Sequence, residues 1–172
     1  MWFFDRKTKN LKNLESSRLW GDKVKIKVGK LFLAAFVIWI TGTVFAMLTC
    51  GWLFNWVYAI PPVIAKSFEA MFTPGNMVAS YILGFLTSVI FVLVYAWLHK
   101  ALPGKGVKKG IYYGLIVWLV GAFSGMVSMP FYMNIATALV IYWILQALVL
   151  NIIIGIIAAA IYKEGKKNKK II

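Results

Sequence analysis

Almost all of the positive charge in this chain is confined to three short segments, which long uncharged stretches separate. Of the 19 Lys and Arg residues, nine precede Leu31, four lie within 100–109 and five follow Tyr162; only Lys66 falls elsewhere. In inserted membrane proteins, Lys and Arg accumulate on the cytoplasmic side of the spans. The pattern therefore predicts a multi-pass protein of the cell membrane whose three basic segments share the cytoplasmic side.

The uncharged stretches predict four transmembrane helices. They cover about residues 31–60, 77–98, 110–128 and 135–162, and about 20 helical residues cross the hydrocarbon core of a bilayer. An even number of crossings returns the chain to its starting side. The sequence therefore predicts an all-α fold, an antiparallel bundle of four transmembrane helices with both termini cytoplasmic. A competing count divides the first stretch into two half-helices around residues 49–51.

The segments outside these spans are assigned from their charge, proline and aromatic content. Residues 1–30 form a basic cytoplasmic arm that either lies on the inner leaflet or is disordered, and residues 163–172 form a basic cytoplasmic tail. The loop at 61–76 is either an ordinary solvated loop or an amphipathic segment at the headgroups. The uncharged reversal at 129–134 is so short that the third and fourth spans must be antiparallel neighbours.

Composition and charge limit which classes of partner the chain can have. The residues are 62% hydrophobic and the formal net charge is +14, whereas soluble domains are close to half apolar. The charges flank spans instead of forming a face with aromatic spacing, so we expect no nucleic-acid partner. Each Lys or Arg beside a span attracts anionic headgroups by about 1 kcal/mol. We therefore expect the bilayer and its anionic cytoplasmic headgroups as partners, unless these charges only set the topology.

Small residues recur at every fourth position on one face of each span. Because lipid tails are as apolar as leucine, membrane helices associate through close approach at such residues. Those of the third span fall within about 60° of arc at about 100° per residue. We expect the stripes to pack the helices into one bundle; alternatively, one stripe faces outward and docks another copy of this chain or another membrane protein. The residues assigned to helix packing are Ser80, Gly84, Ser88, Gly110, Gly114, Gly121, Gly125 and Gly155.

No Asp, Glu, Lys or Arg occurs within 31–65, 70–99 or 110–162. Ionisable residues at membrane depth mark ion paths and proton relays, and the sequence offers no paired carboxylates, nucleophile–base pair or metal-binding motif. We therefore expect no catalytic residue, no metal, no cofactor and no enzymatic activity. The single histidine, His99, lies at a span end and is assigned as an interfacial polar residue.

The polar residues that do lie at depth are amides and hydroxyls. Asn151 falls about 16 Å from the basic tail at about 1.5 Å per residue, and Gln146 lies further along the same span. An unpaired amide in hydrocarbon costs about 2 kcal/mol or more, so each should bond to a neighbouring helix. Two interpretations stay open. These residues are interhelical clamps, or Asn151, Gln146, Tyr142 and Thr87 line a polar pocket for a neutral ligand or a lipid head, with Ser88 beside them.

Two segments carry a resemblance to a known group of proteins. Residues 50–58 (CGWLFNWVY) and 110–118 (GIYYGLIVW) resemble segments of small, uncharacterised four-span prokaryotic membrane proteins. In that group, an aromatic-rich end of the first helix and a glycine-rich third helix recur. The resemblance implies a four-helix membrane fold over most of residues 31–162, and it implies no activity, ligand or site residue.

The sequence thus favours one class of function over another. We expect a non-enzymatic integral membrane protein, a structural or accessory component that binds other membrane helices or lipid. The alternative is a small oligomeric transporter or channel for a neutral or hydrophobic solute, with amides and hydroxyls along its path.

Overall fold

A computed structural model of the chain describes residues 28–62 and 73–162, which form helices and no strands. Four helices in these ranges are long and apolar enough to cross a membrane, as a multi-pass membrane protein requires. They are Val28–Leu53, Pro74–Leu98, Val107–Tyr132 and Thr137–Ile161. The prediction of an all-α chain with four candidate transmembrane helices is confirmed.

Three predictions lie outside the described residues. These concern the basic arm as far as residue 27, the amphipathic segment within 63–72 and the basic tail 163–172.

The first span changes its helical type twice. It runs as α2 (Val28–Ala46), continues as the π-helix η1 (Met47–Leu53) and gives way to the 3₁₀ helix η2 (Asn55–Ala59). The helix is therefore continuous through residues 49–51, where the competing count would divide it. It ends earlier than Ile60, because Phe54 leaves the helical region with φ −121° and ψ 23°. This break turns the chain so that Val57 is buried against the fourth span.

The other spans begin and end at recognisable residues. The second is α4 (Pro74–Leu98), with its proline in the first turn, where a missing amide hydrogen costs nothing. The fourth is α8 (Thr137–Ile161). Between α4 and the third span, the hairpin at 99–106 uses positive φ angles at Gly104 (85°) and Gly106 (56°), a conformation that glycine adopts freely.

The third span is longer than expected and is also interrupted by a π-helix. It consists of α5 (Val107–Val117), the π-helix η3 (Trp118–Phe123), α6 (Ser124–Met126) and α7 (Met129–Tyr132). Pro130 does not break this segment, because it stands in the first turn of α7. The short reversal is the extended segment that follows α7.

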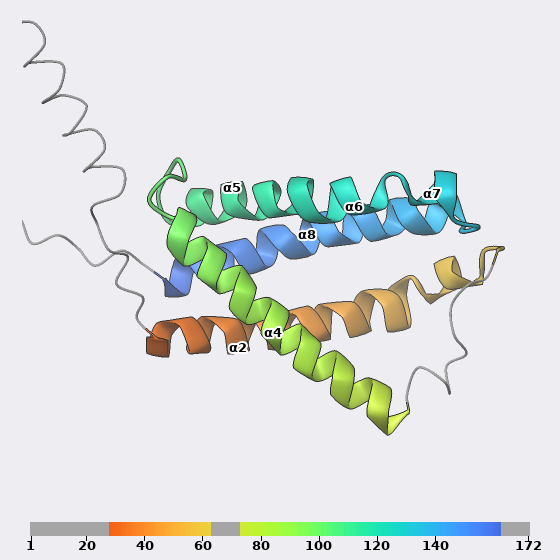
Figure 1. Cartoon of the computed structure of the whole chain (residues 1–172), viewed down its shortest axis with the longest axis horizontal. Coiled ribbons are helices and arrows are strands. Elements are labelled where there is room, and N and C mark those ends of the chain that lie inside the picture. The colour runs from red at the N-terminus through yellow and green to blue at the C-terminus, as the bar shows by residue number, and fades with distance from the viewer. Residues whose placement is uncertain (1–27, 63–72, 163–172) are drawn as a thin grey trace, which may run out of the picture.

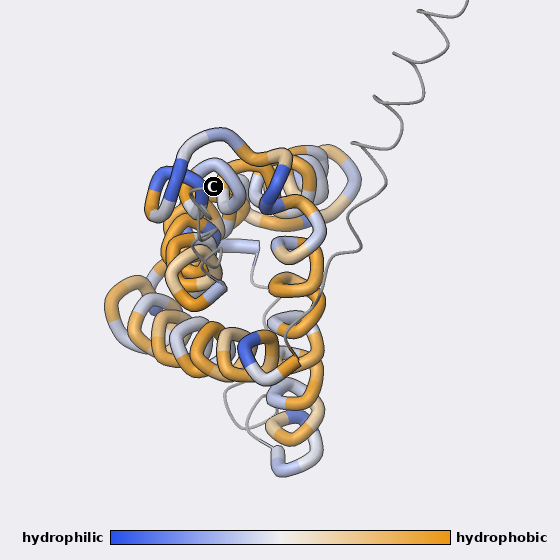
Figure 2. Tube along the Cα trace, turned by 90° about the vertical axis from the view of Figure 1, so that its left-hand side faces the viewer, coloured by the Kyte–Doolittle hydropathy of each residue, from blue (hydrophilic) through white to orange (hydrophobic). Residues whose placement is uncertain are grey.

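The four spans lie roughly along one direction, except that α4 crosses α2 obliquely (Figure 1). The start of α2, the α4–α5 hairpin and the end of α8 lie at one end of the molecule, while η2 and α7 lie at the other. Helix α8 is central, since it packs against both α5 and α2. Hydrophobic residues dominate along the helices, as Figure 2 shows in a view from the hairpin end.

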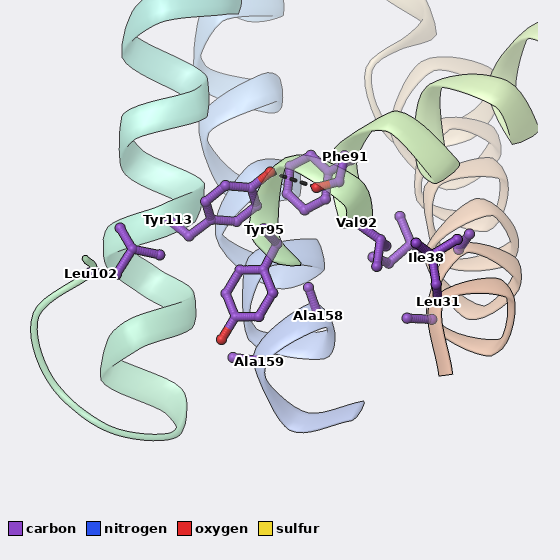
Figure 3. Close-up of a cluster of buried hydrophobic side chains, with 11 residues drawn as sticks. Leu31, Ile38, Phe91, Val92, Tyr95, Leu102, Tyr113, Ala158 and Ala159 are labelled. Carbon is purple, nitrogen blue, oxygen red and sulfur yellow. Dashed lines mark hydrogen bonds between the residues drawn. The ribbon is translucent and has the colours of Figure 1, made fainter. Parts of the chain in front are cut away.

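The main core lies at the hairpin end, and we call it the basic-end cluster (Figure 3). Helices α2, α4, α5 and α8 and the hairpin all contribute to it. The phenol of Tyr113 is completely buried here and donates a hydrogen bond to the carbonyl oxygen of Phe91 at 2.6 Å, which joins α5 to α4. The buried members are Leu31, Ala34, Ala35, Ile38, Phe91, Val92, Tyr95, Leu102, Tyr113, Ala158 and Ala159.

A smaller core, the far-end cluster, lies at the opposite end. Its buried members are Val57, Ile135, Ala136, Leu139 and Val140. They come from η2, from the segment before α8 and from the first turn of α8, so neither α4 nor α5 contributes a buried residue. The two ends of the molecule are therefore packed by different sets of helices.

Candidate functional site

Several polar and aromatic side chains lie together at one place, between η1 and η2 of the first span and the first half of α8. We call this group the polar cluster; its members are Thr49, Cys50, Tyr58, Tyr142, Trp143 and Gln146. Single-turn π-helices occur frequently at functional sites. The π-helix η1 places Thr49 and Cys50, which are adjacent in sequence, where both contact α8.

Gln146 is the centre of the polar cluster. Its Nε2 donates to the Thr49 hydroxyl oxygen at 2.6 Å and to the Cys50 sulfur at 3.0 Å. The Thr49 hydroxyl in turn donates to the carbonyl oxygen of Phe45 at 2.7 Å. One amide thus holds two adjacent residues of the neighbouring helix, which is how a buried amide avoids the cost of an unmade hydrogen bond.

Aromatic rings enclose the polar cluster on its far-end side. Trp143 donates its indole N–H to the Tyr58 hydroxyl at 3.0 Å. The ring of Tyr142 lies 5.3 Å from that of Phe54 and 6.2 Å from that of Tyr58, between ring centroids. The Tyr142 hydroxyl lies 3.8 Å from the Cys50 sulfur, within reach of a weak hydrogen bond to it. Indole and phenol donors are therefore satisfied between helices, as amphipathic rings require when buried.

The chemistry of the polar cluster is that of neutral donors and acceptors. The described residues include no Asp or Glu, and no three of their His, Cys, Asp and Glu side chains approach as a metal site would need. The neighbours of the Cys50 thiol are an amide, a threonine hydroxyl and a phenol, none of which is a general base at neutral pH. The arrangement can clamp two helices or bind a neutral polar group.

The predicted pocket residues are divided among three places. Gln146 and Tyr142 meet at the polar cluster. The amide of Asn151 donates to the carbonyl oxygen of Ala147 in its own helix at 2.8 Å. On α4, exposed Thr87 bonds to the carbonyl oxygen of Leu83 and buried Ser88 to that of Gly84, again within the helix. The structure therefore brings together only two of the four residues named for the pocket.

Glycines on α5 and α8 meet where these helices pack most closely. A Cβ added at Gly110 would lie 2.6 Å from the Gly155 carbonyl oxygen, and one added at Gly114 would overlap the Asn151 carbonyl oxygen. A Cβ at Gly155 would overlap the Gly110 carbonyl oxygen in return. Backbone therefore faces backbone at three of the predicted packing residues, and no side chain fits between them.

The other predicted packing residues differ from one another. A Cβ at Gly84 would lie 3.4 Å from the Trp39 ring, an ordinary contact, and Ser80 is exposed. A Cβ at Gly121 or Gly125 would meet nothing within 4 Å. Gly121 lies within the π-helix η3 and Gly125 after it, and one residue inserted into a helix rotates the residues that follow by about 100°.

Sequence reasoning did not identify the partners of Gln146. Its partners Thr49 and Cys50, and the bonded pair Tyr58 and Trp143 beside them, were not named as pocket residues. One signal could have found them. Aromatic residues mark the same end of the first and fourth spans (Trp52, Trp56 and Tyr58; Tyr142 and Trp143), so Thr49 and Gln146 lie at similar depth.

Comparison with known proteins gives no match: no protein-family model, no curated protein and no solved structure is similar to this chain. The resemblance of residues 50–58 and 110–118 to small four-span membrane proteins stays a prediction from the sequence.

Proposed function

We propose that the chain is a non-enzymatic accessory component of the cell membrane that binds other membrane helices, with lipid as its second partner. In this proposal the four helices span the bilayer as an antiparallel bundle. Both termini and the α4–α5 hairpin are cytoplasmic, because the basic segments gather there. The far-end cluster then lies in the outer half of the membrane.

One observation carries this proposal: the half of the third span after Val117 presents exposed apolar and small residues, although Trp118 bonds to the Ile144 carbonyl oxygen and two methionines pack on the far-end cluster. From Trp118 to Tyr132 this span has no buried residue, and Val120 is 72% exposed. Gly121 and Gly125 stand open on the same stretch. A helix with a Gly-xxx-Gly spacing can approach another backbone closely in lipid, where packing replaces the hydrophobic effect.

Site-specific photocrosslinking tests the proposal. A crosslinking amino acid at Val120 should form adducts with another membrane protein or with a second copy of the chain. The matched control is Leu145, which is 55% exposed on α8. Gly121→Leu should abolish the Val120 adducts without unfolding the chain. If both positions yield lipid adducts alone and mild detergent releases an isolated monomer, the accessory function is wrong.

The polar cluster favours a second candidate, a small oligomeric transporter or channel for a neutral or hydrophobic solute. Gln146 and Thr49 supply neutral donors and acceptors at depth, which such a path needs. Uptake into liposomes by the purified chain, and its loss in Gln146→Leu, would support this candidate. Unaltered flux in Gln146→Leu and Asn151→Leu would remove both residues from any path.

A further inference from the structure

The carbonyl oxygen of the Gln146 side chain, Oε1, is a polar atom at depth that the described part of the chain neither bonds nor encloses. Two other polar side chains show the contrast. His99 is 8% exposed, so it is buried instead of interfacial as the sequence predicted, and its Nδ1 lies 2.7 Å from the carbonyl oxygen of Ala96. The Tyr162 hydroxyl makes no hydrogen bond, but the chain encloses it, so no ligand reaches it. Gln146 Oε1 is both unbonded and accessible.

The contacts of the amide nitrogen determine where this oxygen points. The Thr49 hydroxyl donates its single proton to the Phe45 carbonyl oxygen at 2.7 Å, so it can only accept a bond from Gln146. The Gln146 nitrogen therefore faces Thr49, 2.6 Å away, and Cys50, 3.0 Å away. Oε1 is on the other arm of the planar amide, so it points away from the Thr49 hydroxyl.

Hydrocarbon surrounds Oε1 when the helices span a bilayer. Gln146 lies three residues before residue 149, the midpoint of α8, which is about 5 Å along the helix. The hydrocarbon core is about 30 Å thick, so phospholipid headgroups and bulk water lie about 15 Å from its centre. An acceptor without a donor is costly in that medium. The donor must therefore come from a molecule within the hydrocarbon.

The surroundings of the amide favour a neutral molecule that carries a ring. The described residues include no Asp or Glu, so a cationic donor would have no counter-charge. Tyr142 lies one turn before Gln146 and both reach the Cys50 sulfur, so aromatic rings stand beside the amide. The Tyr142 ring is 5.3 Å from that of Phe54, which is 40% exposed, and 6.2 Å from that of Tyr58. Such rings favour a further ring in offset or edge-to-face contact.

We propose that Gln146 Oε1 and the aromatic rings beside it bind a neutral, lipid-soluble phenol or hydroquinone. The ligand hydroxyl donates to Oε1, and the ligand ring packs against those of Phe54, Tyr58 and Tyr142. A phenol is uncharged at neutral pH and supplies both the donor and the ring. The inference goes beyond the accessory function and gives the second candidate a class of solute. It rests on the helices spanning a bilayer, whichever side the hairpin faces.

The test measures the unfolding midpoint of the full chain in micelles of an uncharged detergent as pentamethylphenol is added. The comparison probe is its methyl ether, pentamethylanisole, which has the same ring and no O–H donor. A ligand that binds the folded chain raises the midpoint. Both probes should raise it, and the same rise should need about tenfold more ether than phenol, because the ether lacks one hydrogen bond.

Gln146→Met keeps the length of the side chain and removes the acceptor. In this variant, half of the rise should need about tenfold more phenol than in the parent chain, and the preference for phenol over ether should disappear. Phe54→Leu removes a ring and keeps the acceptor. It should weaken the binding of both probes alike and leave the preference for the phenol intact.

Thr49→Val and Asn151→Leu are the matched controls. Thr49→Val removes one bond of the clamp and leaves the Gln146 acceptor in place, while Asn151→Leu removes an amide that bonds only within α8. Both should keep the preference for the phenol. The proposal is wrong if the parent chain does not distinguish the two probes, if Gln146→Met still prefers the phenol, or if Thr49→Val loses that preference as well.

This test is separate from that of the accessory function. Loss of the Val120 crosslinks leaves the response to the phenol untouched, and loss of the Gln146 effect leaves those crosslinks untouched.

Discussion

The two halves of the third span carry the same small-residue stripe and pack in opposite ways. In α5, Gly110 and Gly114 lie against the backbone of α8. Gly121 lies within the π-helix η3 and Gly125 after it, and a Cβ added at either would meet nothing within 4 Å. The spacing of small residues therefore shows only that another helix can approach closely. The local helical register determines which neighbouring helix the small residues face.

The two ends of the molecule repeat this contrast on a larger scale. At the hairpin end, four helices share the basic-end cluster, and Tyr113 bonds α5 to α4. At the far end, the first span and α8 are held by the polar cluster and the far-end cluster, while the beginning of α4 is exposed. The buried core of the hairpin end is therefore built from all four spans, whereas that of the far end comes only from the first span, the start of α8 and the segment before it.

The largest expected difference in the free energy of unfolding is between alanine substitutions at Gly114 and at Gly121. Gly114→Ala should lower the free energy of unfolding by about 1–3 kcal/mol, because the new methyl group overlaps the Asn151 carbonyl oxygen. Gly121→Ala should change it by less than about 0.5 kcal/mol or raise it, since alanine favours a helix over glycine. Unfolding both variants in the same detergent measures this difference. Equal losses of unfolding free energy would contradict the conclusion that the two halves of the span pack differently.

A smaller difference in the free energy of unfolding is expected between leucine substitutions of Gln146 and Asn151, the two side-chain amides of α8. Gln146→Leu should cost about 1–1.5 kcal/mol, because Thr49 and Cys50 both lose their donor from the neighbouring helix. Asn151→Leu should cost less, because its side-chain amide bonds only within α8. The same unfolding assay compares them. A larger loss for Asn151→Leu would mean that the polar cluster does not hold the far end.

The smallest effect concerns the hydrogen bond from Tyr113 on α5 to the Phe91 carbonyl oxygen on α4. Tyr113→Phe keeps the buried ring and removes one hydrogen bond, so it should cost about 0.6 kcal/mol, the average for such bonds in membrane proteins. Tyr112→Phe on the same helix is the control and should cost nothing measurable, since Tyr112 is 46% exposed. Indistinguishable unfolding of the two variants would show that the basic-end cluster depends on packing alone.

The sequence predicted the number of spans and their approximate positions, because charge and hydropathy act locally along the chain. It did not predict the π-helices at Met47–Leu53 and Trp118–Phe123, since no local sequence pattern marks where a helix accommodates an extra residue. Without knowledge of the π-helix in the third span, the sequence could not show that Gly110 and Gly114 contact α8 whereas Gly121 and Gly125 do not. The end of the first span at Phe54 was also missed; beyond it Val57 is buried among residues some 80 positions later, which no local pattern shows.

The candidate site was predicted only in part. Depth and polarity singled out Gln146 and Tyr142, and both belong to the polar cluster. Their partners Thr49 and Cys50 lie almost 100 positions earlier, and only the shared aromatic end of the two spans indicates that they lie at similar depth. The burial of His99 also could not be predicted, because the ring of Tyr162 that covers it comes from the other end of the chain.

Cysteine labelling in intact cells tests most directly whether the helices cross the membrane with the hairpin end inside. In a Cys50→Ser background, an impermeant maleimide should label Tyr132→Cys from outside, as it should Lys66→Cys. Lys105→Cys should react only after permeabilisation, and Ile90→Cys, which is 60% exposed in the middle of the second span, should resist labelling throughout. Labelling of positions 132 and 105 from the same side, or ready labelling of position 90, would contradict the account.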